Sequence, residues 1–225
     1  EYKKRADYIS SFFKRYADKC DTVLDLACGT GSVSKYLTDL GYNVIGLDLS
    51  DEMLTVASSK QIKNAMFIKG DMTDFELPHK VDCCVCSLDS INHLKDIVEV
   101  KKCFDCVYNS LNDGGVFVFD VNTVYKHKNV LGNNTFVFDE EDFFLSWDNE
   151  YLGDNTVRIL LDFFVYNGKN YDRFSEEFNE KAYSVNELKS VLDNFNIIGI
   201  YDELNLDDIK KNSERIYFVL KKGDN

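Results

Sequence analysis

A carboxylate and two glycines stand close together in the stretch Asp25-Leu-Ala-Cys-Gly-Thr-Gly31, which follows an apolar run and precedes a helical pattern. A glycine loop between a strand and a helix usually binds an anion, because helix N-termini and exposed backbone N–H groups carry partial positive charge. A carboxylate four residues before the first glycine would repel a pyrophosphate, but it suits an ammonium or sulfonium group. The acid therefore favours a ligand with a cationic tail over one with phosphates.

A dinucleotide-binding loop is the alternative interpretation. Its fingerprint is G-x-G-x-x-G, and the third glycine position is occupied here by Ser34. The incomplete fingerprint therefore makes a nucleotide-dependent oxidoreductase a weaker interpretation than an enzyme whose ligand has a cationic tail. A non-catalytic module that keeps a cofactor pocket is a further alternative that the sequence leaves open.

Alternating strands and helices in the first half of the chain would position these residues. Apolar patterns predict strands at 22–27, 43–50, 65–71, 81–88 and 116–122. Helical patterns fall within 1–19 and at 31–41, 51–60 and 96–111, and a turn is expected at 112–115. This alternation predicts an α/β fold with a doubly wound, mostly parallel sheet, whose ligands bind at the carboxyl ends of the strands.

The pattern changes after residue 122. Aromatic residues cluster between 134 and 183 without a helical period, and turn signals at 152–155 and 167–170 divide this segment. It predicts an antiparallel meander of three or four strands, inserted after the fifth strand. A helix at 184–195 and strands at 196–203 and 215–222 follow. We expect one domain over 1–225, with 134–183 as an inserted β subdomain.

Charge is concentrated in the inserted segment. It holds twelve acidic and four basic residues, which gives −8 of the chain's net charge of −13. We expect these acids to form a solvated outer face, with the aromatic residues as the meander's own core. The alternative is that the acids attract a cationic or amine substrate.

The whole-chain composition excludes several classes of function. A net charge of −13 argues against a nucleic-acid partner, since phosphate contacts need clustered Lys and Arg. No apolar run approaches the length of a membrane span. The seven cysteines favour reduced thiols in the cytoplasm over a disulfide framework.

Two cysteine pairs fit a generic zinc spacing. Cys83-x-x-Cys86 and Cys103-x-x-Cys106 are separated by sixteen residues. The first pair lies in a predicted buried strand, where residues three apart point to opposite faces, and the second lies on an apolar helix. We therefore expect these cysteines to pack as small hydrophobic residues, with no metal.

Five segments between Val23 and Thr123, in the order "VLDLACGTG", "VIGLDLS", "IKGDMTDF", "VDCCVCSLDSINHL" and "LNDGGVFVFDVNT", resemble the motifs of class I S-adenosylmethionine-dependent methyltransferases. The resemblance implies a Rossmann-like seven-stranded sheet of order 3-2-1-4-5-7-6, with the last strand antiparallel. It also implies S-adenosylmethionine as the cofactor.

The resemblance assigns roles residue by residue. The glycines admit the methionine part of the cofactor, the acid of the first motif contacts its ammonium, and the acid of the second accepts from the ribose hydroxyls. The acid of the third motif and its successor border the adenine, and the residues after the fourth strand close the methionine side. The expected cofactor residues are Asp25, Ala27, Gly29, Gly31, Asp48, Leu49, Asp71, Met72, Ser87 and Leu88, with Tyr8 of the N-terminal helix as a further contact.

Catalytic candidates follow the fourth strand. Methyl transfer from a sulfonium needs a base only when the nucleophile keeps its proton. The candidates are Asp89, Asn92 and His93, of which we expect Asp89 and His93 to be catalytic. Related small-molecule enzymes often carry an aromatic residue, commonly Tyr, at the histidine's position. The adenine-methylating signature N-P-P-Y is absent, and the insertion resembles the substrate lid of glycine and aminosugar N-methyltransferases. We expect a monomer or homodimer that methylates a small molecule, with nitrogen as a candidate acceptor atom.

Overall fold

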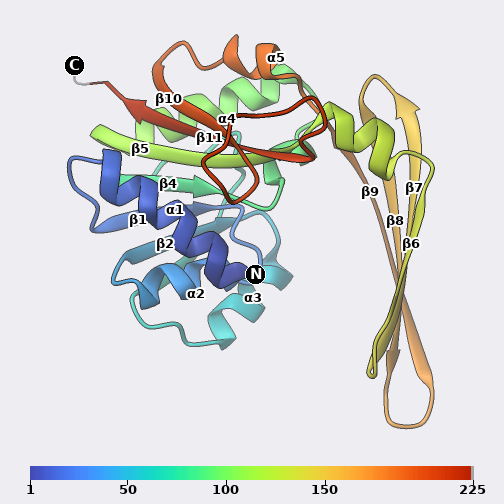
Figure 1. Ribbon diagram of the computed structural model, residues 1–225. Coiled ribbons are helices and arrows are strands. Elements are labelled where there is room, and N and C mark those ends of the chain that lie inside the picture. Colours follow the sequence, from blue (N-terminus) through green and yellow to red (C-terminus); the bar gives the residue numbers. More distant parts are fainter. Residues whose placement is uncertain (224–225) are drawn as a thin grey trace.

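A computed structural model describes residues 1–223 and contains a seven-stranded sheet and a separate four-stranded sheet (Figure 1). The strand order in the larger sheet is β10-β11-β5-β4-β1-β2-β3. The first five strands are parallel, and β11 runs antiparallel to both of its neighbours. This confirms the predicted order and the antiparallel last strand. The strands are β1 (Thr22–Leu26), β2 (Asn43–Asp48), β3 (Ala65–Lys69), β4 (Val81–Cys86), β5 (Leu111–Asn122), β10 (Phe195–Asp202) and β11 (Arg215–Lys222).

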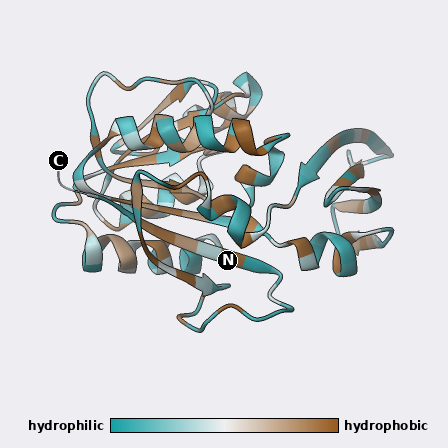
Figure 2. Ribbon diagram, turned by 90° about the horizontal axis from the view of Figure 1, so that it is seen from above, coloured by the Kyte–Doolittle hydropathy of each residue, from teal (hydrophilic) through white to brown (hydrophobic). Residues whose placement is uncertain are grey.

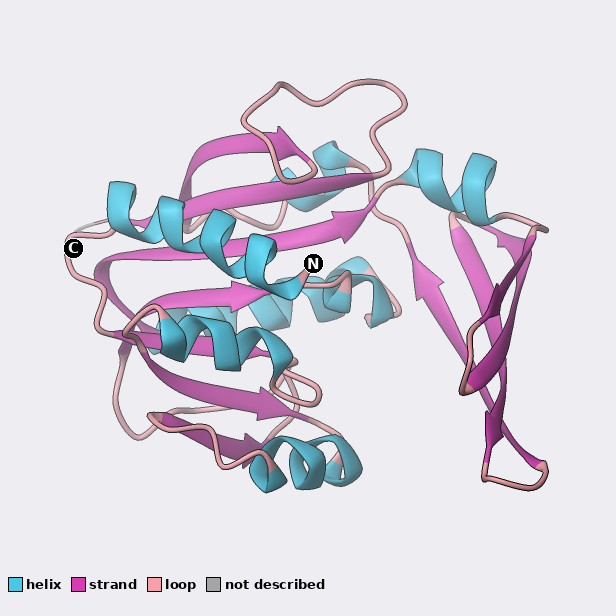
Figure 3. Cartoon of the chain, turned by 60° about the horizontal axis from the view of Figure 1, so that its bottom comes forward, coloured by secondary structure: helices cyan, strands magenta, loops and turns pink. Residues whose placement is uncertain are grey.

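Helices cover both faces of this sheet (Figures 1 and 3). One face carries α1 (Tyr2–Tyr16), α2 (Ser32–Asp39) and α3 (Asp51–Ser59), and the other carries α4 (Ile97–Ser110) and α5 (Val185–Lys189). Alternate strand residues supply the two cores: Val85 packs with Phe13 of α1, and Phe119 packs with Phe104 of α4. Hydrophobic residues accordingly run along the central strands and one side of the helices (Figure 2). No helix within residues 1–223 has the length and apolar character needed to cross a membrane.

The cysteines occupy both cores. Cys83 lies in the cluster with α1 and α2, whereas Cys86 lies on the opposite face with Cys103 of α4. All seven cysteines are free thiols. The prediction that these residues pack as hydrophobic side chains is confirmed for Cys83, Cys86 and Cys103, whereas Cys106 is only half-buried and lies in neither cluster.

The inserted segment forms four antiparallel strands in chain order: β6 (Thr135–Asp139), β7 (Phe143–Gly153), β8 (Thr156–Tyr166) and β9 (Tyr171–Lys181). The base of this sheet has a core, in which Val157 and Ile159 pack with Trp147 and Phe178. Farther out the sheet is a single layer (Figures 1 and 3), and aromatic residues such as Phe174 are exposed. The expectation that the aromatic residues form the meander's own core is therefore right only near the base.

Several predicted boundaries were wrong. Residues 112–115 belong to β5, which starts at Leu111 and shifts its pairing with β4 at an irregularity, so they form no separate turn. The helix expected at 184–195 is only α5, because the chain then tightens into turns with i to i−3 bonds, such as the Val191 N–H to the Leu188 carbonyl. A π-helical segment, η2 (Lys126–Leu131), was not predicted.

Candidate active site

The glycine loop after β1 contains three residues in the left-handed backbone region: Ala27 (φ +56°), Gly29 (φ +54°) and Gly31 (φ +73°). A Cβ atom at Gly31 would lie 2.8 Å from the ring of Phe67, so the fold itself excludes a side chain there. A Cβ atom at Gly29 would meet no protein atom within 4 Å. Gly29 therefore leaves open space beside its backbone, which a ligand can approach closely.

Asp48 lies beside this loop, because it ends β2, which pairs in parallel with β1. Its Oδ2 accepts the N–H of Gly29 at 2.7 Å, and its Oδ1 accepts the N–H of Ser50 at 2.9 Å. These two bonds fix the plane of the carboxylate. Each oxygen keeps a further lone pair, so the group can still accept from two neighbouring hydroxyls.

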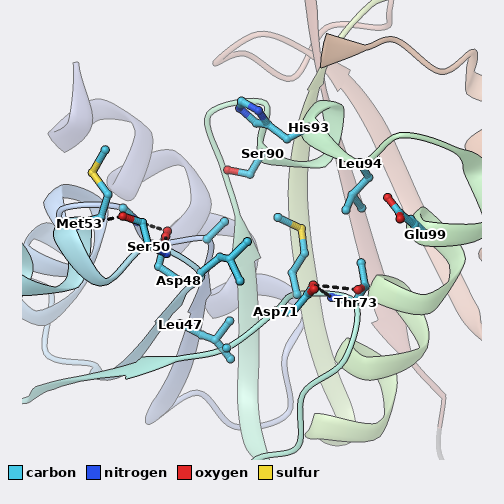
Figure 4. Close-up of a pocket in the computed structure, with 15 residues that line it drawn as sticks. Leu47, Asp48, Ser50, Met53, Asp71, Thr73, Ser90, His93, Leu94 and Glu99 are labelled. Atoms are coloured by element: carbon cyan, nitrogen blue, oxygen red, sulfur yellow. Dashed lines mark hydrogen bonds between the residues drawn. The ribbon is translucent and has the colours of Figure 1, made fainter. Parts of the chain in front are cut away.

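Two adjoining cavities of about 530 and 260 Å³ open at this edge of the sheet. In the larger one, Asp48 lies across from Leu94 and Glu99, with Ser90 and His93 on the short 3₁₀ helix η1 (Ser90–His93) that follows β4 (Figure 4). Both cavities are lined by Ala27, Gly29, Met53 and Ser90. Together they have the size of a small-molecule site with a few polar groups.

Asp71 and Asp25 mark different parts of these cavities. Asp71 lines the larger one, and its Oδ1 accepts both the N–H and the hydroxyl of Thr73 at 2.8 Å. Asp25 lines the smaller one, is 2% exposed, and accepts the hydroxyl proton of Ser34. Burial, reinforced by the negative charge of Asp48, raises the pKa of Asp25 to about 7.

The loop after β4 is held by buried charges. Leu88 and Asp89 are both left-handed, at φ +61° and +55°, and their N–H groups donate to the two oxygens of Asp120 at 2.9 Å. Asp120 is fully buried, and Arg215 of β11 pairs with Asp120 and, at 2.9 Å, with Asp89. Arg5 of α1 lies 3.6 Å from Asp120. This ionic cluster positions the loop against both β11 and α1.

The cavities bring together most of the residues predicted from sequence. Between them they are lined by Asp25, Ala27, Gly29, Asp48, Leu49, Asp71, Met72, Ser87, Leu88 and His93. The strands β2, β3 and β4 end at Asp48, Lys69 and Cys86, so the residues that follow them lie beyond the strands. They are Leu49, Asp71, Met72, Ser87 and Leu88 in loops and His93 at the end of η1.

Three predicted residues lie elsewhere. Gly31 packs against Phe67, and Asp89 has one oxygen on Arg215 and the other on Asn122, at 2.6 Å. Tyr8 donates its hydroxyl to the Asn205 carbonyl and packs against another tyrosine ring on β11. None of the three lines either cavity.

Sequence reasoning missed several residues that line the cavities: Tyr2, Cys28, Met53, Thr73, Ser90, Leu94 and Glu99. Tyr2 could have been proposed from the sequence, because the N-terminal helix was already expected to contact the cofactor through Tyr8. Tyr2 and Tyr8 are six residues apart, so they lie on different faces of α1, and only the first turn reaches the site.

Comparisons with known proteins agree with this architecture. A family profile described as "Methyltransferase domain" matches residues 23–115. The putative methyltransferase YqeM of Bacillus subtilis (strain 168) is 33% identical over 208 residues, which are 89% of this chain and 84% of that protein. The crystal structure of an S-adenosylmethionine-dependent methyltransferase from Clostridium acetobutylicum ATCC 824 superposes with a TM-score of 0.93 at 36% identity, covering 100% and 93% of the two chains.

A third relative matches only part of the chain. The dTDP-3-amino-3,6-dideoxy-alpha-D-glucopyranose N,N-dimethyltransferase of Streptomyces fradiae is 33% identical over 119 residues, which are 52% of this chain and 46% of that enzyme. A Rossmann-like sheet with a glycine loop and acids at successive strand ends defines the class of protein. The chain belongs to the class I S-adenosylmethionine-dependent methyltransferases.

S-adenosylmethionine is the cofactor of this enzyme. The residues present fit it: Gly29 leaves open space, the carboxylate of Asp48 can accept from two hydroxyls, and Asp25 offers a buried acid to a cation. The comparisons support neither an oxidoreductase nor a non-catalytic module.

Proposed function

We propose that the chain methylates a small molecule, with an amine nitrogen as the acceptor atom. The main support for this proposal is the position of the four-stranded sheet beside the larger cavity. The ring of Phe178 on β9 lies 5.2 Å, centroid to centroid, from the ring of His93, which lines that cavity. Most of the acids on this sheet are exposed, as expected for a solvated face, and together they give it a negative charge that also favours a cationic acceptor. The Streptomyces fradiae relative is named as a sugar N,N-dimethyltransferase, which supports the same class of acceptor.

Different residues of the two cavities would bind different parts of the cofactor. S-adenosylmethionine supplies an electrophilic methyl group on a sulfonium. In our proposal, Asp48 accepts from the ribose hydroxyls, Asp25 from the ammonium and Asp71 from the adenine amino group. Holding these groups at fixed positions aligns the methyl with the acceptor, which lowers the entropic part of the barrier.

His93 would act on the acceptor side. Its side chain is 46% exposed on the rim of the larger cavity, where it can take the proton that an ammonium acceptor must lose before its nitrogen attacks. Asp89 is held by Arg215 and Asn122, so we assign it a positioning role in the loop. The four-stranded sheet, as a lid, would limit access of water.

The raised pKa of Asp25 predicts a pH-dependent affinity for the cofactor. Asp25 must be charged to pair with an ammonium, and in the free protein it is mostly protonated below about pH 7. We therefore expect the affinity for S-adenosylmethionine, measured by calorimetry, to rise about 25-fold between pH 5.5 and 7.5. Asp25→Asn should remove this dependence. Adenosine, which lacks the ammonium, is the control and should bind equally well at both pH values; a flat profile for S-adenosylmethionine would contradict this role of Asp25.

A screen of acceptors tests the proposed function. Amines, phenols and carboxylates are incubated with the protein and methyl-labelled S-adenosylmethionine, and an RNA and a protein mixture serve as macromolecular arms. We expect transfer to amines. Preferential transfer to carboxylates, or to either macromolecule, would show that the proposed acceptor class is wrong.

Replacing His93 tests the base. With the best amine from the screen, His93→Phe should lower kcat by about 10²-fold or more, because general-base catalysis typically contributes this much. His79→Phe, at an exposed position outside both cavities, is the matched control and should leave kcat unchanged. Unchanged turnover of His93→Phe at all pH values removes it as the base.

The cellular setting is also part of the proposal. Seven free thiols, most of them buried, favour a reducing compartment such as the cytoplasm. The net charge of −13 disfavours a nucleic acid as partner.

A further inference from the structure

One acid of the lid strand β9 points inward. Glu180 is 6% exposed, although most residues of this strand face solvent. Its Oε1 lies 3.9 Å from Nε2 of His93, and its Oε2 lies 3.6 Å from Nε2 of His127 on η2. The Nδ2 group of Asn122 also donates to Oε2, at 3.2 Å. Glu180 thus joins the lid to the loop after β4 and to the segment that leads into the lid.

The side of Glu180 that faces His127 is fixed. Nδ1 of His127 lies 2.8 Å from the Asn155 carbonyl, which can only accept, so Nδ1 carries a proton. Nε2 of His127 is buried without a hydrogen-bond partner, and Oε2 of Glu180 lies 3.6 Å from it. Burial by itself would raise the pKa of Glu180, but its interactions with His127, His93 and the Asn122 amide hold it below its usual value. Glu180 is therefore a carboxylate.

The strand that carries Glu180 is anchored beside His93. The side chain of Asn92 donates to the carbonyls of Asn122 at 3.1 Å and of Lys181 at 3.0 Å. It therefore ties β9 to β5 immediately next to both residues of the pair. Phe178, two positions before Glu180 on the same side of β9, packs against the His93 ring.

We propose that Glu180 is a positioning residue for His93: it accepts the Nε2–H of the imidazole, leaving Nδ1 as the unprotonated nitrogen that faces the acceptor. This inference rests on the proposed role of His93 as base. A carboxylate that holds one ring nitrogen fixes both the tautomer and the orientation of a catalytic imidazole. The separation of 3.9 Å is close enough that a small rotation of the half-exposed imidazole brings Nε2 into hydrogen-bond distance of Oε1.

Other charged groups near Glu180 also influence His93 and remain in place when Glu180 is substituted. Lys126 of η2 donates to Oδ1 of Asn122 at 3.0 Å, and Asp89 accepts from Nδ2 of the same asparagine at 2.6 Å. His127 contacts Glu180 directly. These groups are retained when Glu180 alone is changed, so a change in the behaviour of His93 would report the loss of the carboxylate.

The test compares Glu180→Gln with Glu176→Gln. Glu176 lies on the same side of β9, four residues farther out, and is exposed, so it is the matched control. The chain has three histidines, so nitrogen NMR with labelled histidine, assigned through His93→Phe, reports the tautomer of His93 without any acceptor. We expect the Nε2–H form in the parent chain and in Glu176→Gln, and a loss of that preference in Glu180→Gln.

Kinetics with the best amine of the screen give a second readout. For Glu180→Gln we expect kcat to fall about ten-fold and the acid limb of the pH profile of kcat/KM to move to lower pH, because a carboxylate no longer stabilises the imidazolium. Affinity for S-adenosylmethionine should stay unchanged. In a His93→Phe background the second substitution should have no further effect. If Glu180→Gln does not fold, Glu180→Asp replaces it in the test. Its shorter side chain keeps the negative charge but holds it farther from His93, so the acid limb of the pH profile should move to lower pH by a smaller amount.

The possible failures are distinguishable. An unchanged tautomer and an unmoved acid limb in Glu180→Gln, or an equal loss of kcat in the His93→Phe background, overturns the positioning role. Full activity of His93→Phe alone instead overturns the proposed base, and the positioning role with it.

Discussion

Asp48→Ala should weaken the binding of S-adenosylmethionine by at least about 100-fold. Two charge-assisted hydrogen bonds from ribose hydroxyls would be lost, each contributing about 1.5–3 kcal/mol. The substitution also removes the acceptor of the Gly29 N–H, which lies 2.7 Å from Oδ2. The glycine loop would then lose its support where the cofactor approaches its backbone.

Calorimetric titration of S-adenosylmethionine measures this effect. Asp51→Ala is the matched control: Asp51 lies three residues later, is exposed, and pairs with Lys69 at the surface. It should bind within about two-fold of the parent chain, since exposed ion pairs contribute little. If Asp48→Ala binds as tightly as Asp51→Ala, Asp48 does not hold the ribose.

Asp120→Ala should destabilise the fold by about 3–5 kcal/mol, the typical effect of removing one partner from a buried ion pair. Asp120 is fully buried between Arg5 and Arg215, and it accepts the N–H groups of Leu88 and Asp89. Without it, two guanidinium groups lose their buried counter-charge. Two consecutive left-handed residues also lose the bonds that hold them in a strained backbone region.

Urea unfolding measures the free energy of unfolding for this variant. Glu203→Ala is the control, because Glu203 contacts the same two arginines, Arg5 at 3.3 Å and Arg215 at 3.5 Å, but is 42% exposed. It should cost less than about 1 kcal/mol. If the two substitutions lower the free energy of unfolding equally, the burial of Asp120 does not account for its contribution to stability.

The sequence predicts the sheet and its ligand-binding edge well, because both depend on local patterns. Apolar runs alternate with helical ones in a fixed order, and the acids Asp48 and Asp71 follow those runs directly. A residue that follows a parallel strand must lie at the carboxyl edge of the sheet. The glycines of the loop are likewise required by local backbone geometry, with φ values of +54° and +73°.

Residues that reach the site from afar were less accessible to sequence reasoning. Glu180 is one of twelve acids in the insertion, and only the register of β9 and the bonds of Asn92 turn it towards His93. Tyr2 differs from Tyr8 only in helical phase. The ion pairs of Asp89 depend on Arg215, which is 126 residues away in sequence. Such tertiary partners leave no periodic signal.

A crystal structure of the chain with S-adenosylmethionine bound tests the central claim most directly. We predict the ribose hydroxyls on the carboxylate of Asp48, the ammonium beside Asp25, the adenine bordered by Asp71 and Met72, and the transferable methyl directed to the space between His93 and the lid strand β9. A cofactor whose methyl points away from His93, or whose ribose lies apart from Asp48, would contradict this account of the site.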